Sequence, residues 1–320
     1  MSTMLLTRSR VESLLDIKEV IAAVENAFRE LAEGGASMPP KAYVVLDKGD
    51  FRAMPSVLPG AAGLKWVNVH PGNKVKGLPT VMAIMIYNDP QTGYPLAVMD
   101  ATAITACRTG AASAVAARYL ARPQSKSLGI IGAGSQAYTQ IEAHTVLFGI
   151  KEVRVFDLSQ AAVYALIKNL PQYPLKGCSL EETAASDIIC TLTTARKPFL
   201  KREWLKPGTH INAVGADAAG KQELETSILK EAIVVVDDMV QAEKAGEINV
   251  PVSRGDYSPD EVYATLGEIV SGRKPGRVDD KAITVFDSTG IAIEDLAVAR
   301  LVYEKARTSG DYRSIDFIEG

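Results

Sequence analysis

The stretch Ser125–Asp157 constrains the fold more than any other part of the chain. An apolar run over Ser127–Ile131 is typical of a buried parallel strand, and it leads into the turn Gly132–Ala137, with the pattern G-x-G-x-x-A. A helical stretch and a second strand, Glu152–Phe156, follow, and the next residue is Asp157. This order of strand, glycine turn, helix, strand and acid predicts a dinucleotide-binding βαβ unit.

Each small residue of the turn has a role in such a unit. Gly132 allows the tight turn, and Gly134 lets the backbone approach a pyrophosphate closely. Ala137 keeps the helix near the sheet, and the helix N-terminus offers N–H groups and a positive dipole to phosphates. Asp157 would accept hydrogen bonds from the adenosine ribose, and because Leu158 rather than a cation follows it, NAD is favoured over NADP. The alternative is a purely structural turn, which the flanking elements disfavour.

The composition argues against several other classes of protein. With 320 residues, of which 47% are hydrophobic, the chain can form a large core or two domains. A net charge of −3 argues against a nucleic-acid-binding surface, and no apolar run approaches the ~20 residues that span a bilayer. The N-terminal segment carries charges, unlike a secretory peptide. Three cysteines and three histidines without metal-ligand spacing indicate reduced thiols, a cytoplasmic location and no metal site.

The N-terminal part predicts a helix followed by a mostly antiparallel sheet. An apolar stripe at helical spacing runs over Asp16–Gly34, with Asp16 as the N-cap. Turns rich in glycine and aspartate separate the strand-like segments that follow. The predicted strands are Ala42–Asp47, Phe51–Met54, Leu64–Val69, Thr80–Tyr87 and Tyr94–Met99. An alanine-rich helix, Thr102–Leu120, then leads to the nucleotide unit.

After Asp157 the alternation of helices and strands continues, as in a doubly wound domain. The predicted elements are the helices Ala161–Leu170 and Pro259–Ser271 and the strands Asp187–Thr193, Thr209–Val214, Ile233–Asp237 and Ile283–Phe286. The last amphipathic helix, Ile291–Ala306, has no predicted strand after it, so we expect it to return to the first domain. The sequence thus predicts an α/β protein, with a Rossmann doubly wound domain over residues 116–290 and a smaller α+β domain over residues 1–115 and 291–320.

Two cations lie in unusual surroundings. Strand alternation places Lys65 on one face with Val67 and Val69. It is either an edge-strand lysine whose amine reaches water or a site lysine with a lowered pKa suited to proton transfer. Arg108 is surrounded by small residues in ACRTGAA. It is either a solvated helix arginine or a guanidinium that binds a carboxylate at close range.

Other residues also allow two interpretations. Lys41 and Arg52, each taken alone, are typical of surface charges. Asp217 follows a predicted strand, at the rim where α/β domains bind ligands, although it could instead cap the next segment. Ser288–Gly290 likewise follow a strand, and their hydroxyls could cap a helix or reach the nicotinamide amide.

In their order, five motifs of this chain resemble the ornithine cyclodeaminase/μ-crystallin family over nearly its whole length: LKWVN, RTGAA, GAGSQA, HINAVGAD and FDSTG. The resemblance implies an NAD(P)-dependent homodimer whose smaller domain binds substrate and dimerises. It also implies that Lys65, Arg108 and Asp217 line the substrate pocket beside the nicotinamide. The cofactor-binding residues expected for NAD are Thr109, Gly132, Ala133, Gly134, Ser135, Gln136, Asp157, Thr191, Thr193, Val214, Gly215, Ala216, Ser288, Thr289 and Gly290.

Two positions distinguish branches of the family. The cyclodeaminase branch has an arginine where this chain has Lys41 and a glutamate where it has Arg52. The pair found here, within MPPK and RAMP, resembles the archaeal-type alanine dehydrogenase branch. A glutamate would help to hold a second amino group, such as that of ornithine, whereas Arg52 repels that group and attracts a carboxylate. The substrate is therefore expected to be a small monocarboxylic amino acid and its 2-oxo acid.

The resemblance implies reversible oxidative deamination of L-alanine to pyruvate and ammonia with NAD. In this scheme Arg52 and Arg108, with Lys41 nearby, hold the carboxylate, while Lys65 and Asp217 share the proton transfers. The alternative is a ketimine reductase acting on pyrroline- or piperideine-2-carboxylate, which the carboxylate-binding cations do not exclude. Two more activities stay open: an ornithine cyclodeaminase, which Arg52 disfavours, and a binding protein without turnover like the crystallin relatives.

Overall fold

The computed structural model describes residues 2–318, and the chain divides into two compact units. The first comprises Met1–Arg108 and Ile291–Gly320, and the second comprises Thr109–Gly290. The expected boundary at 115/116 lies within helix α3 (Thr102–Leu120), whereas the division falls earlier in that helix, after Arg108. The other division falls at 290/291.

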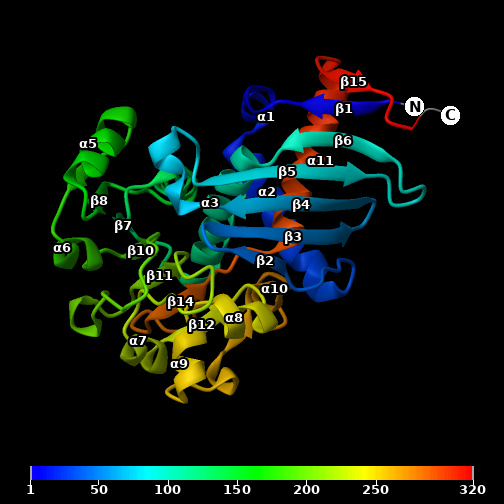
Figure 1. The fold of residues 1–320 in the computed structure, drawn as a ribbon. Coiled ribbons are helices and arrows are strands. Elements are labelled where there is room, and N and C mark those ends of the chain that lie inside the picture. The colour runs from blue at the N-terminus through cyan, green and yellow to red at the C-terminus, as the bar shows by residue number, and fades with distance from the viewer. Residues whose placement is uncertain (1, 319–320) are drawn as a thin grey trace. The chain divides into compact units, whose positions relative to one another are not determined.

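The first unit is built on a seven-stranded sheet with the order β15-β1-β6-β5-β4-β3-β2 (Figure 1). Adjacent strands are antiparallel, except that β1 and β6 are parallel. The strands are β1 (Thr3–Leu6), β2 (Ala42–Leu46), β3 (Gly49–Leu58), β4 (Ala61–Val69), β5 (Val81–Asn88), β6 (Pro95–Asp100) and β15 (Arg313–Ile315). The helical segments are α1 (Arg8–Leu14), α2 (Ile17–Glu33), η1 (Pro71–Lys76), the start of α3 and α11 (Ala292–Ser309).

One face of this sheet is covered by helix α11, which packs against β3, β4, β5 and α2. A Cβ at Gly63 would come within 3.0 Å of Leu296, so the helix lies close to the strand that carries Lys65. Asp16 caps α2 as expected, by accepting two backbone N–H bonds, and Gly34 ends the helix in the left-handed conformation (φ +81°). The chain thus folds back from its C-terminal part onto its N-terminal sheet.

The opposite face of the same sheet is apolar and exposed. Strand alternation and register place Val44, Trp66 and Ile84 on this face, away from Lys65. Their exposed fractions are 51%, 41% and 52%, respectively. A contiguous apolar face of this kind is typical of an interaction surface.

The second unit is an eight-stranded parallel sheet with the order β13-β12-β14-β11-β10-β7-β8-β9. From β7 the chain proceeds outward to β8 and β9, and then returns to β10 on the other side of β7. This reversal of direction is the topological switch point of a doubly wound sheet, and it confirms the Rossmann prediction. The strands are β7 (Ser127–Ile131), β8 (Glu152–Phe156), β9 (Leu175–Gly177), β10 (Ile188–Thr191), β11 (His210–Ala213), β12 (Ile233–Val236), β13 (Ala264–Thr265) and β14 (Thr284–Asp287).

The helical segments of this unit are α4 (Ser135–Leu147), α5 (Gln160–Asn169), α6 (Leu180–Ala184), η2 (Arg202–Trp204), α7 (Thr226–Glu231), α8 (Met239–Ala245), α9 (Asn249–Arg254), η3 (Pro259–Glu261) and α10 (Leu266–Val270), together with most of α3. Among residues 2–318, no helix combines the length and the apolar character needed to cross a bilayer.

Two local predictions were wrong. A strand, β15, does follow the last helix, and it pairs antiparallel with β1. The segment Pro259–Ser271 is not one helix, because Tyr263 N–H bonds to Val234 O and strand β13 then pairs with β12. Sheet pairing therefore interrupts a segment whose proline and serine are typical of a helix start.

Candidate functional site

The glycine turn lies at the C-terminal end of β7, beside the switch point. Gly132 has φ +107°, and a Cβ there would lie 3.0 Å from Leu192 O, so this position requires glycine. Gly134 precedes α4, and a Cβ there would meet nothing within 4 Å. The turn therefore leaves space for a ligand at the N-terminus of a 13-residue helix, whose first N–H groups suit phosphate oxygens.

Two further residues complete this end of the site. Asp157 follows β8 and accepts hydrogen bonds from Ala133 N–H and Ser159 N–H, both at 2.8 Å. Its carboxylate is thereby held at the edge of the turn, where it has further lone pairs for ribose hydroxyls. Gln136, in the first turn of α4, has a buried Oε1 that lacks a hydrogen-bond partner among the described residues. A buried acceptor without a donor is consistent with a ligand that supplies one.

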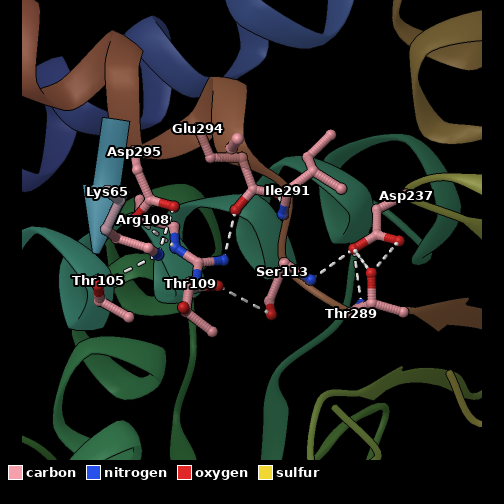
Figure 2. Close-up of polar contacts among 12 residues, drawn as sticks. Lys65, Thr105, Arg108, Thr109, Ser113, Asp237, Thr289, Ile291, Glu294 and Asp295 are labelled. Carbon is pink, nitrogen blue, oxygen red and sulfur yellow. Dashed lines mark hydrogen bonds and ion pairs between the residues drawn. The ribbon is translucent and has the colours of Figure 1, made fainter. Parts of the chain in front are cut away.

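Apart from Thr109, the other expected cofactor residues lie at or just beyond the same end of the parallel strands. Thr191 ends β10, and Val214–Ala216 follow β11. Ser288–Gly290 follow β14, where Thr289 N–H and Gly290 N–H each donate to Asp237 at 2.6 Å (Figure 2). The second unit thus gathers the expected residues at the edge where α/β sheets bind ligands.

Lys65 of the first unit lies deep in the protein, with 1% of its surface exposed. Its Nζ donates to Asp295 Oδ2 at 2.5 Å and to Thr105 Oγ1 at 3.4 Å (Figure 2). Burial lowers the pKa of Lys65 to about 7, because the charge of Asp295 only partly opposes desolvation, and the charges of Arg108 and Lys41 lower the pKa further. A lysine with this pKa can give or take a proton near neutral pH.

Arg108 shares the same carboxylate. Its Nε donates to Asp295 Oδ1 at 3.1 Å, and its Nη1 donates to Glu294 Oε2 at 2.7 Å (Figure 2). Glu294 and Asp295 are fully buried and lie in the first turn of α11, where the helix dipole favours negative charge. Lys65, Arg108, Glu294 and Asp295 therefore form one group, which we call the buried ion cluster.

Lys41 and Arg52 lie in the same unit. Lys41 immediately precedes β2, and its charge acts on Lys65. Arg52 is 5% exposed, donates to Asp50 Oδ1 at 2.7 Å and has its guanidinium 5.2 Å from the ring centre of Tyr43. The register pairs Arg52 with Val67, so Arg52 and Lys65 point to the same face of the sheet. These cations could together bind a small carboxylate.

Asp217 belongs to the second unit, on the loop after β11. It forms an ion pair with Lys221, four positions further along the same loop. Thr109 lies in α3, where its carbonyl accepts hydrogen bonds from Ser113 Oγ and Gln140 Nε2. Within residues 2–318, no group of three histidine, cysteine or acidic side chains is arranged to hold a metal ion.

Glu294 and Asp295 were not among the site residues expected from the sequence. Acidic residues in the first turn of a helix are common capping residues, so nothing in AIEDL by itself indicates a site. A useful signal would have been the two cations, Lys65 and Arg108, each of which requires a buried counter-charge.

Comparison with known proteins gives matches over nearly the whole chain. The profile of the ornithine cyclodeaminase/mu-crystallin family matches residues 1–310. The alanine dehydrogenase of Archaeoglobus fulgidus is 52% identical over 99% of this chain and 99% of its own. An archaeal alanine dehydrogenase dimer solved with bound NAD has a TM-score of 0.97 at 52% identity, covering 99% of this chain and 100% of that one. The Δ1-pyrroline-2-carboxylate reductase of Thermococcus litoralis, solved with NADH and L-proline, has a TM-score of 0.94 at 41% identity, covering 98% and 100%. This chain therefore belongs to the ornithine cyclodeaminase/mu-crystallin family.

Proposed function

We propose that this protein is an NAD-dependent alanine dehydrogenase. It converts L-alanine, NAD⁺ and water into pyruvate, ammonium, NADH and a proton, reversibly. The observation that carries the proposal is the burial of Lys65, with a pKa of about 7, in one ion cluster with Arg108. The 52% identity to an archaeal alanine dehydrogenase supports the same activity.

The second unit holds the cofactor. Gly134 and the N-terminus of α4 receive the pyrophosphate, and Asp157 receives the adenosine ribose. The loops after β10, β11 and β14 receive the nicotinamide end. When bound, NAD accepts a hydride from the α-carbon of the amino acid.

The charged residues of the first unit act on the substrate. Arg108 and Arg52 hold its carboxylate, and Lys41 adds positive charge. The ammonium form of Lys65 polarises the 2-oxo oxygen during amination, and its neutral form accepts a proton during deamination. Asp217, which belongs to the second unit, accepts a proton from the amine or from the water that attacks the imine carbon.

The protein acts as a homodimer. The exposed apolar face of the seven-stranded sheet, with Val44, Trp66 and Ile84, is the surface proposed for the partner subunit. The archaeal alanine dehydrogenase of known structure was solved as a dimer, which supports a homodimer but does not identify its interface. Burial of these side chains against a second copy would be stabilising, because each is now largely in contact with water.

The test is NADH oxidation followed by absorbance, with pyruvate and ammonium, other 2-oxo acids and two cyclic imines, pyrroline-2-carboxylate and piperideine-2-carboxylate, in parallel. We expect turnover with pyruvate and ammonium, and loss of turnover without loss of NADH binding in Lys65→Ala. Turnover with cyclic imines alone would replace the proposal with a ketimine reductase. Release of ammonia from ornithine without accumulation of NADH would identify a cyclodeaminase instead.

A further inference from the structure

Four carboxylates of the second unit are buried almost completely, and the proposed mechanism uses none of them. Asp237 and Asp287 lie at the C-terminal ends of β12 and β14, and Glu223 and Glu247 lie on loops beyond β11 and α8. Each has at most 1% of its surface exposed. Because a buried carboxylate is costly unless it is hydrogen-bonded, the partners of these groups indicate their role.

Three of the four, Asp287, Glu247 and Glu223, are linked in series, because the carboxylate of each accepts a hydrogen bond from a backbone N–H of the next residue or loop in the series. We call this series the relay. Asp287 Oδ1 accepts from Glu247 N–H at 2.8 Å. Glu247 Oε1 accepts from Glu223 N–H at 2.8 Å and from the next N–H at 2.6 Å. Glu223 in turn accepts from Thr193 N–H at 2.7 Å, Thr193 Oγ1 at 2.6 Å and Gly215 N–H at 3.0 Å. The relay therefore ends on two of the loops expected to contact the nicotinamide.

The pKa values of all three carboxylates are raised by burial. Burial raises the pKa of Asp287 to about 8, and burial together with the charge of Glu223 raises the pKa of Glu247 well above its usual range. Burial also raises the pKa of Glu223, but the Thr191 hydroxyl, the hydroxyl and N–H of Thr193 and the Gly215 N–H oppose the rise. The three hydrogen bonds from Thr193 and Gly215 favour the charged form of Glu223, and they use both of its oxygens.

The two loops approach each other closely at Glu223. A Cβ at Gly215 would lie 2.2 Å from Thr193 O and 2.6 Å from the Glu223 carboxyl group. Only glycine fits at position 215, so the two backbones can approach this closely. The Glu223 carboxylate is hydrogen-bonded to both loops, and we infer that it fixes their spacing.

We propose that Glu223 is a positioning residue, which joins the loop after β10 to the loop after β11 and sets their geometry for the nicotinamide end of NAD. The inference rests on the proposed function, because it assumes that these loops bind the cofactor. Glu223 does not itself contact the reacting atoms in this scheme.

The test is Glu223→Gln, measured by NADH fluorescence titration, steady-state kinetics and thermal unfolding. A glutamine keeps one acceptor oxygen, but its NH₂ group replaces the other and faces an N–H donor, to which it cannot form a hydrogen bond. One of the two loops therefore loses its hydrogen bond to residue 223. We expect the Kd for NADH and the KM for NAD to rise roughly tenfold or more, as for loss of a charged hydrogen bond, while kcat at saturating NAD changes less than about twofold. The matched control is Glu225→Gln on the same segment, whose carboxylate accepts from Arg202 N–H, and it should bind NADH as the wild type does.

Unchanged NADH affinity in folded Glu223→Gln would overturn the inference, even if the melting temperature falls, because a merely structural role predicts that result. If this variant does not fold, Thr193→Val removes only the hydroxyl donor, and an unchanged Kd in that variant overturns the inference as well. Wild-type protein that does not bind NADH at all would instead refute the proposed function.

Discussion

Replacing Asp295 with asparagine removes the charge that holds the proton on Lys65. In the wild type, burial lowers the pKa of Lys65 to about 7, and Asp295 opposes this shift through its charge and a hydrogen bond of 2.5 Å. Asparagine has nearly the same shape but no charge. The pKa of Lys65 in Asp295→Asn is therefore expected to lie below that of the wild type.

The size of the effect follows from the geometry. An opposite charge in contact shifts a pKa by roughly 1 to 3 units, so we expect a fall of about 2 units, to roughly 5. At pH 7 about half of the wild-type lysine is protonated but only ~1% of the variant lysine, which gives about a 50-fold loss in the amination rate. At pH 5 the same arithmetic gives a loss of only about twofold.

The assay is amination of pyruvate between pH 5 and pH 8, and the ratio of variant to wild-type rates at each pH cancels the titration of ammonia itself. The control is Glu304→Gln on the same helix, whose exposed carboxylate pairs with Arg307 and should leave the profile unchanged. Superimposable pH profiles for folded Asp295→Asn and wild type would refute the reasoning.

The same shift affects stability. Between pH 7 and 10.5, the unfolded chain binds a proton at Lys65 that the folded protein has released. The contribution of Lys65 to the free energy of unfolding therefore increases with pH across this window. In Asp295→Asn the window should extend to lower pH, which can be measured by urea unfolding at several pH values.

Two further predictions concern the cofactor turn and the exposed sheet. Gly134→Ala should fold like the wild type but weaken NADH binding about tenfold or more, since its Cβ fills the space left for the pyrophosphate. Gly132→Ala should lose roughly 1 to 3 kcal/mol of stability, because alanine is strained at φ +107°. Thermal unfolding and NADH titration of both variants distinguish the two effects, and equal melting temperatures would contradict the assignment. Ile84→Asp should convert the proposed dimer into folded monomers, as measured by light scattering after gel filtration. The Ile84 side chain is 52% exposed in one subunit, and a carboxylate buried there at an interface is costly. A dimer of unchanged stability would place the interface elsewhere.

Local patterns predicted the elements that are stabilised by neighbours in sequence. The βαβ unit around Gly132, the capped helix α2 and the central antiparallel strands follow from periodicity and turn residues, and the structure has them. The short strands β1 and β15 were missed, because three or four residues carry little periodic signal and their pairing joins opposite ends of the chain. Strand β13 was missed for the same reason, because it has two residues and its partner, β12, lies elsewhere in the sequence.

The amino-acid sequence by itself determined the doubly wound unit, the position of its glycine turn and the cations suited to a carboxylate, since each depends on residue type and short spacing. Only the tertiary structure decided which counter-charges these cations have. Asp295 lies 230 positions from Lys65 and 187 from Arg108, and its carboxylate reaches both only because α11 packs on the sheet. The pKa of Lys65 depends on that packing, because desolvation and the nearby charges, which no local pattern contains, together set its affinity for a proton.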